Sequence, residues 1–221
     1  MTKAIWTLIF QSTLQTLQMV VFSTIFSILL GLPLGILLCV TRPEEHGGIM
    51  PKPVLNSILD KIVNVLRSFP FIILMIILFP LSRLLVGTTI GTTATIVPLS
   101  IAAAPFAARV IETSLKEVDT GVVQAARSMG STNSQIIFKV MIPEALPSLV
   151  SVVTLTIINL VGYSAMAGAI GGGGLGDLAI RYGYQRTRTD VMIVAVVIIL
   201  VLVELIQFIG NKISAQILSK R

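Results

Sequence analysis

The sequence predicts an all-α integral membrane protein with five transmembrane helices and short helices on its cytoplasmic side. Two observations predict this class. Of the 221 residues, 54% are hydrophobic and only 12% are charged, whereas soluble domains carry about 25% charged residues. The apolar residues are also gathered into long runs, and a helix needs about 20 mainly apolar residues to cross a bilayer. A single membrane bundle is therefore expected rather than soluble domains.

Five runs are long enough to span the membrane, and no internal repeat relates them. They cover residues 17–40, 62–81, 90–111, 149–170 and 191–209. We expect residues 1–16 to form an N-terminal periplasmic segment, 17–213 the transmembrane domain and 214–221 a cytoplasmic tail. Residues 112–148 form a long polar loop within the domain. The first apolar residues are interrupted by glutamines and no A-x-A site follows, so the first span is expected to be retained.

Proline and small residues inside these runs predict close packing between helices. A membrane tolerates the carbonyl groups that a proline frees only where neighbouring helices satisfy them. Gly31 and Gly35 form a GxxxG motif, and the third run is rich in alanine. Small residues let two helix backbones approach closely. We expect this packing to occur within one chain rather than through a dedicated dimer motif.

The positions of lysine and arginine predict the orientation. Cytoplasmic loops of membrane proteins carry an excess of both residues. With the N-terminus outside and the C-terminus in the cytoplasm, eleven basic residues lie on the inner side and five on the outer side. The inverted orientation reverses this excess, although Arg181, Arg186 and Arg188 in one outer loop run against the rule. The sequence therefore predicts a multi-pass protein of the inner membrane, and its net charge of +6 reflects this orientation.

The polar loop between the third and fourth runs carries signals for two short helices. Asp119 or Thr120 can cap the first, whose apolar residues include Ala126, and Gly130 suits its end, where a left-handed conformation is favoured. Thr132 and Gln135 have the spacing of a capping box for the second. Pro143 and Pro147 are expected to terminate that helix. We therefore expect two amphipathic helices on the inner face.

Two helices joined by a glycine turn also describe a DNA-binding helix-turn-helix. A recognition helix has to be polar and basic, and this one offers only Lys139. Membrane spans flank the pair closely. Nucleic acid is therefore excluded as a partner, and the remaining alternatives are an ordinary structured loop and a docking site for another protein.

The docking interpretation comes from a family resemblance. The segment resembles the EAA loop of the permease subunits of ATP-binding-cassette importers, whose pattern is E-A-A-x3-G-x9-I-x-L-P. This sequence departs from the pattern at three positions: Gln124 replaces Glu, Val140 replaces Ile and Ile142 replaces Leu. The first replacement removes a charge. In that family the loop forms coupling helices that sit in a groove of a partner ATPase. The matching residues here are Gln124, Ala125, Ala126, Gly130, Val140, Ile142 and Pro143.

The resemblance extends over nearly the whole chain and narrows to methionine-importer permeases. It is carried by GLPLG at 31–35, RSFPFIIL at 67–74, VPLS at 97–100 and LVGYSAM at 160–166. It implies a second copy of this chain, two copies of an ATPase subunit and an external methionine-binding protein. Methionine as the substrate follows from the resemblance alone, and the alternative is the same type of permease for another amino acid or small nutrient.

No residues in the sequence indicate catalysis, a metal or a cofactor. It has no GxxxxGK[ST] motif, so ATP hydrolysis is expected on another polypeptide. The GxGxxG pattern at 171–176 follows an apolar run instead of a strand. We interpret it as a flexible outer loop, which either is a plain connector or contacts the binding protein or closes the periplasmic gate. His46 is the only histidine and is expected to be solvated, and Cys39 is expected to be an inert packing residue.

The fourth run is our candidate for the translocation pathway. Tyr163, Ser164 and Met166 lie among small residues toward its outer end, where a methionine could close a narrow opening. The alternative is ordinary core packing, since methionine fills gaps well. Glu204 in the fifth run could line the pathway, but we expect it near the cytoplasmic border, close to Lys212.

Overall fold

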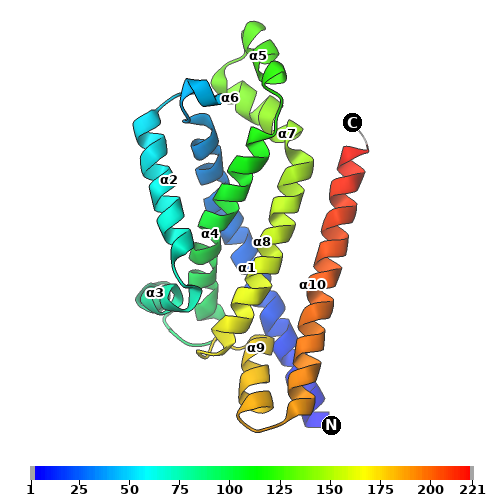
Figure 1. The fold of residues 1–221 in the computed structure, drawn as a ribbon. Helices are drawn as coiled ribbons and strands as arrows, with labels where there is room; N and C mark the ends of the chain where they lie inside the picture. The colour runs from blue at the N-terminus through cyan, green and yellow to red at the C-terminus, as the bar shows by residue number, and fades with distance from the viewer. Residues whose placement is uncertain (1–2, 220–221) are drawn as a thin grey trace. The chain divides into compact units, whose positions relative to one another are not determined.

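The computed structural model describes residues 3–219, and every regular element in that range is a helix (Figure 1). The ten α-helices are α1 (Lys3–Val40), α2 (Pro53–Ser68), α3 (Phe71–Val86), α4 (Thr92–Lys116), α5 (Thr120–Ser128), α6 (Asn133–Gln135), α7 (Ile142–Glu144), α8 (Leu146–Gly168), α9 (Gly174–Leu178) and α10 (Thr189–Leu218). A short 3-10 helix η1 (Glu44–His46) and two π-helical segments, η2 (Ile136–Met141) and η3 (Ala179–Tyr184), complete the chain.

The predicted all-α membrane class is confirmed. Helices α1, α4, α8 and α10 are each long and apolar enough to cross a membrane, and the pair α2 and α3 supplies a fifth span if the two count as one. Helix α1 is longer than the run that predicted it. Its 38 residues measure about 57 Å at 1.5 Å per residue, against about 30 Å of bilayer core.

Helices extend toward both ends of the described chain. Residues 3–16, which belong to the expected N-terminal periplasmic segment, are helical and continue directly into the first span. At the other end, α10 runs to Leu218 and includes most of the predicted tail. Met1, Thr2, Lys220 and Arg221 lie outside the described residues.

The second predicted span, 62–81, is not one continuous helix. Helix α2 ends at Ser68, and α3 begins at Phe71. Between them, Pro70 has an extended backbone with φ −59° and ψ 124°. Proline has no N–H for the helical ladder and disfavours the helical conformation in the residue before it, here Phe69. These two effects explain the break.

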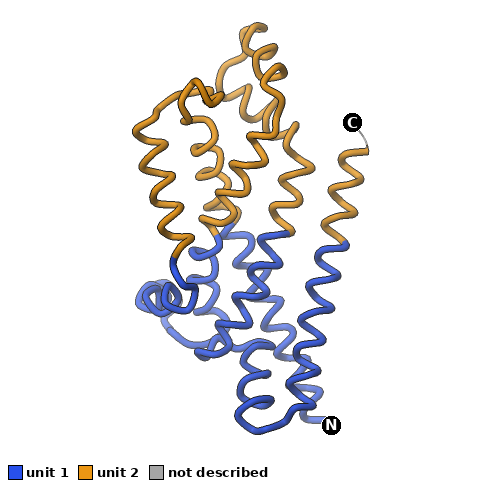
Figure 2. The backbone as a smooth tube through the Cα atoms, viewed as in Figure 1, with its two compact units in different colours: residues 1–27, 69–103, 155–208 blue, residues 28–68, 104–154, 209–221 orange. Residues whose placement is uncertain are grey.

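The chain divides into two compact units (Figure 2), and the four long helices each contribute to both. Residues 1–27, 69–103 and 155–208 form the first unit, whose core contains Met19, Leu99 and Leu160. Residues 28–68, 104–154 and 209–221 form the second, in which the ends of α1 and α4 pack against α5 and η2. The second unit therefore contains the segment that resembles the EAA loop.

Small residues bring α1 and α4 into close contact, as the sequence predicted. In the first unit, the hydroxyl of Ser27 donates to the Ser100 carbonyl at 3.1 Å. In the second unit, Gly31 lies against Ala104, and Gly35 lies against Ala108. A Cβ atom on Gly35 would stand 2.6 Å from the Ala108 carbonyl oxygen. The GxxxG motif therefore serves packing within the chain.

We expect Gly35→Ala to lower the free energy of unfolding by about 1–3 kcal/mol, because the added methyl group must push α1 away from α4. Thermal unfolding of the purified permease would measure the loss. Gly162→Ala is the matched control, since Gly162 is also helical and nothing lies within 4 Å of the position that its added methyl group would take. Equal stability of the two variants would contradict the close contact.

Candidate functional site

Helix α5 is held by a cap at each end. At its start, the Asp119 carboxylate accepts a hydrogen bond from the Gly121 N–H at 2.5 Å. At its end, Gly130 has φ +79°, and its N–H donates to the Arg127 carbonyl at 3.0 Å. The Ser131 N–H donates to the Ala126 carbonyl at 3.1 Å. These two bonds form a Schellman motif, in which glycine is favoured because the left-handed backbone strains other residues.

The second predicted helix begins where its capping box placed it. The Thr132 hydroxyl accepts from the Gln135 N–H at 3.3 Å, and the Gln135 side chain accepts from the Thr132 N–H at 2.9 Å. The expected stop at the prolines is wrong. Helix α7 runs through Pro143, and α8 begins one residue before Pro147. Both prolines occupy first-turn positions of helices, where a missing N–H costs nothing.

The apolar residues of α5 and η2 lie on two different faces. Ala126 is buried, and half-buried Val123 packs against the core of the second unit. Val122, Met129 and Phe138 are instead exposed, by 43%, 78% and 64%. Exposed apolar residues grouped on one short segment indicate a surface that binds another protein. We refer to Val122, Met129 and Phe138 as the apolar docking face.

The residues that match the EAA motif are divided between exposed positions and the core. The structure leaves four of them exposed, buries one and half-buries two. The exposed residues are Gln124, Ala125, Gly130 and Pro143; Ala126 is buried; Val140 and Ile142 are half-buried. The motif therefore combines residues that anchor the segment to its own chain with residues available to a partner.

The three pathway candidates on α8 have different surroundings. Tyr163 stacks on Phe71, with ring centroids 4.4 Å apart. Ser164 is buried, and its hydroxyl donates to the Val161 carbonyl of its own helix at 2.8 Å. Met166 is 48% exposed. Residues three apart share a helix face, so Tyr163 and Met166 lie together while Ser164 points elsewhere.

The glycine run at 171–176 does not form the flexible loop that the sequence suggested. Helix α9 is buried along its length and lies against α1. The Gly174 N–H donates to the Gln15 amide oxygen at 2.9 Å, and the Leu175 N–H donates to the Thr16 hydroxyl at 2.8 Å. A Cβ on Gly176 would collide with the backbone of Ala165. The glycines are required here by close backbone approach.

A charged pair joins α9 to η3. Arg181 donates to the carboxylate of Asp177 one helical turn before it. This hydrogen bond and the negative charge of Asp177 raise the pKa of the Arg181 guanidinium, which therefore remains charged. Asp177 and its partner bound a cavity of about 460 Å³ that Gln15 and Gly173 also line. The sequence analysis identified neither Gln15 nor Asp177 as functional.

A network of charged side chains joins α2 to α4. Arg109 contacts Asp60 at 2.6 Å and Glu112 at 2.7 Å, and it donates to the Asn64 amide oxygen at 2.8 Å. Glu112 is buried and also pairs with Lys116. Isolated charges are costly in apolar surroundings, so they are paired with one another here. Glu204, in contrast, is exposed, and no ion pair within residues 3–219 joins it to Lys212.

Comparisons with known proteins agree with this geometry. The family model for the binding-protein-dependent transport system inner membrane component matches residues 31–219. The "Probable D-methionine transport system permease protein MetI" of Vibrio cholerae is 52% identical over 92% of this chain and 89% of its own. The methionine import system permease protein MetP of Bacillus subtilis is 49% identical over 80% of this chain and 79% of its own.

Two solved structures contain chains with a similar fold. The structure described as inward-facing conformations of the MetNI methionine ABC transporter contains a chain that matches with a TM-score of 0.95 and 46% identity, covering 98% of this chain and 99% of that one. An amino acid ABC transporter crystallised with histidines matches with a TM-score of 0.76 over 95% of this chain and 94% of that one. Its identity is 20%, so it supports the fold alone.

Proposed function

Because this chain belongs to the family of inner-membrane components of binding-protein-dependent transport systems, we propose that it is the membrane-spanning subunit of an ATP-binding-cassette importer for methionine. Two relatives named for methionine transport align along most of their own length at about half identity. That likeness is the observation that supports methionine as the substrate. A permease for another amino acid is the alternative, and the relative crystallised with histidines resembles this chain only in fold.

The importer consists of two copies of this chain, two ATPase subunits and an external methionine-binding protein. Hydrolysis takes place on the ATPase subunits, since this sequence contains no GxxxxGK[ST] motif. The contact with the ATPase is the apolar docking face, and Gln124, Ala125 and Gly130 lie exposed near it. A rigid helix with an apolar face fits a groove on a partner.

We call residues 120–144, from α5 to α7, the coupling segment. It transmits motion to α8 because the chain continues almost directly from α7 into α8. Helix α6, η2 and α7 follow one another without a break, and only Ala145 separates α7 from α8. When ATP binding draws the two ATPase subunits together, the two coupling segments move with them. Each α8 then moves as a rigid element, and the importer changes between inward-open and outward-open states. Transmission of this motion requires a rigid coupling segment, and the caps of α5 and α6 contribute to its rigidity.

The gate lies on α8, at Tyr163 and Met166. These two side chains share one helix face, and the Met166 side chain is exposed on this single chain. Ser164 supports the helix through its bond to Val161 rather than facing the substrate. The binding energy for methionine resides mainly in the external protein, which agrees with the scarcity of charged residues in the spans.

The N-terminus lies outside and the C-terminus lies in the cytoplasm. The excess of basic residues on the proposed inner side supports this orientation. Native Cys39 is buried, so a maleimide is expected to react only with a cysteine introduced at the surface. Ser134→Cys on α6 is expected to react with an impermeant maleimide only after the membrane is opened, whereas Tyr184→Cys reacts in intact cells. Labelling of Ser134→Cys in intact cells would reverse the orientation.

ATPase activity of the reconstituted complex tests the assembly and the substrate together. The permease and its ATPase subunit are reconstituted in lipid, and hydrolysis is measured with the binding protein alone, with methionine, and with histidine. We expect the loaded binding protein to raise turnover with methionine and not with histidine. Stimulation by histidine alone would assign the substrate to the alternative, and an ATPase that does not associate would contradict the importer itself.

A further inference from the structure

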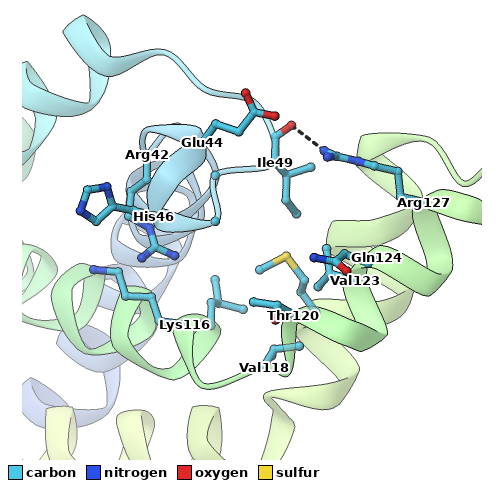
Figure 3. Close-up of a pocket in the computed structure, with 14 residues that line it drawn as sticks. Arg42, Glu44, His46, Ile49, Lys116, Val118, Thr120, Val123, Gln124 and Arg127 are labelled. Atoms are coloured by element: carbon cyan, nitrogen blue, oxygen red, sulfur yellow. Dashed lines mark hydrogen bonds between the residues drawn. The ribbon is translucent and has the colours of Figure 1, made fainter.

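A second cavity lies between helix α5 and the loop around η1, and none of the three residues of the apolar docking face lines it. It measures about 280 Å³, slightly below the range of about 300–1,000 Å³ that is usual for small-molecule pockets. The end of α4, helix α5 and the loop around η1 enclose it (Figure 3). All the residues that line it belong to the second unit, and none of the pathway candidates Tyr163, Ser164 and Met166 is among them.

The charged side chains that line this cavity are mainly cationic. Arg42, Lys116 and Arg127 contribute three positive charges, and Glu44 is the only acidic residue in the lining. Lys116 pairs with Glu112, which lies outside the lining. Within residues 3–219, the two arginines form no ion pair with a carboxylate. The cavity therefore has two guanidinium groups that form no ion pair, and Glu44 is the one carboxylate that shares its lining.

Each of these arginines is positioned by a bond to the backbone. The Arg42 Nε donates to the Cys39 carbonyl at 3.1 Å, at the end of α1. The Arg127 guanidinium reaches from α5 to the Ile49 carbonyl at 3.1 Å, as Figure 3 shows. Each guanidinium has five N–H donors, so most remain available. Guanidinium groups fixed on two elements around one cavity supply charged donors for the oxygen atoms of an anion.

Gln124 adds a further donor. Its amide lines the cavity from α5, at the position where the motif of the family has glutamate. A glutamate there would place a carboxylate inside the cavity and serve as an internal counter-ion. The amide instead offers N–H donors and no charge. This substitution leaves the cavity able to accept an external anion.

We propose that this cavity binds the phosphate group of an anionic phospholipid from the inner leaflet. Arg42 lies two residues after the end of α1, and Lys116 is the last residue of α4, so the cavity lies at the ends of two candidate membrane spans. Basic pockets at this level on the cytoplasmic side recognise lipid headgroups. The assignment to the inner leaflet rests on the orientation proposed above. The cationic character of the cavity does not depend on that orientation.

An anionic headgroup in the cavity would lie between Arg42 after the end of α1 and Arg127 on α5. The lipid thereby fixes α5 to the membrane bundle at the point where motion from the ATPase enters. Coupling between hydrolysis and transport then depends on the anionic lipid content of the membrane. No residue of the apolar docking face and neither proposed gate residue lines the cavity, and the site needs no methionine.

Lipid retention by the purified permease–ATPase complex tests the proposal. The complex is extracted in mild detergent, exchanged into nanodiscs of phosphatidylcholine with or without phosphatidylglycerol, and analysed by native mass spectrometry. We expect the native complex to retain phosphatidylglycerol selectively. Arg42→Gln and Arg127→Gln should each weaken this retention by about tenfold or more, because each removes a charge-assisted contact. Gln124→Glu should weaken it as well, because its carboxylate occupies the cationic site.

Lys212→Gln is the matched control, since it removes one exposed cation at the end of α10 and leaves the cavity intact. Titration with inorganic phosphate separates the two sources of the anion. Phosphate binding that Gln124→Glu abolishes, without lipid retention, would assign the cavity to a soluble phosphate. Equal retention of both lipids together with no phosphate binding would overturn the proposal, and so would retention that none of the three cavity variants changes. The labelling of Ser134→Cys in intact and opened cells, measured separately, keeps a failure here distinct from a failure of the proposed orientation.

Discussion

Met129→Asp is expected to abolish co-purification of the ATPase subunit with the permease. The Met129 side chain is 78% exposed on this chain, and in the importer we expect the ATPase to cover it. A carboxylate buried there without a partner would cost several kcal/mol. Affinity would fall by more than about 100-fold, since each 1.4 kcal/mol is a factor of ten. Val122→Asp, on the same face, should have the same direction of effect.

The control for this experiment is Met129→Leu, which keeps an apolar side chain of similar size and should retain the ATPase. The two variants should unfold at the same temperature, because an exposed side chain contributes little to the stability of its own chain. A tagged permease, captured from detergent-solubilised membranes, gives the ratio of the subunits directly. A stoichiometric ATPase on Met129→Asp would mean that the apolar docking face lies elsewhere.

Arg109→Leu is expected to have the largest effect on stability. The guanidinium joins Asp60 on α2 with Glu112 on α4, and the Glu112 side chain is only 4% exposed. Removing one partner of a buried pair leaves an uncompensated charge and costs about 3–5 kcal/mol. We expect the lower end of this range, about 3 kcal/mol, because Glu112 keeps its contact with Lys116. Unfolding should begin in the second unit.

The single cysteine makes this measurement direct. Cys39 is 2% exposed in the native chain, so a thiol-reactive dye reports unfolding as the temperature rises. Lys139→Leu is the control, since it removes an exposed cation that forms no ion pair within residues 3–219. If Arg109→Leu unfolded at the same temperature as this control, the network between α2 and α4 would not contribute to stability.

The elements that sequence analysis predicted well are those with local signals. Asp119, Thr132 and Gln135 bond to backbone atoms within three residues of themselves, so their spacing is sufficient to identify them. Gly130 takes its left-handed conformation for the same local reason. The long spans were predictable because hydrocarbon requires a continuous apolar run.

The elements that sequence analysis missed depend on contacts between distant residues. Gln15 and Thr16 hold α9 across about 160 positions of sequence, and a polar residue in an apolar run does not reveal its partner. Arg109 and Asp60 lie about 50 positions apart in sequence, and no local pattern predicts that they form an ion pair. The prediction that Pro143 stops a helix failed because a proline that ends one helix can also begin the next.

Uptake of labelled methionine into proteoliposomes tests the central claim most directly. The permease and its ATPase are reconstituted with ATP inside the vesicles, where the coupling segments of one population face the lumen, and with the loaded methionine-binding protein outside. The account predicts that methionine accumulates in the lumen above its external concentration only when hydrolysable ATP is present, and that Met129→Asp abolishes the accumulation. Methionine that equilibrates without ATP, or no uptake by a complex that hydrolyses ATP in response to the binding protein, would contradict it.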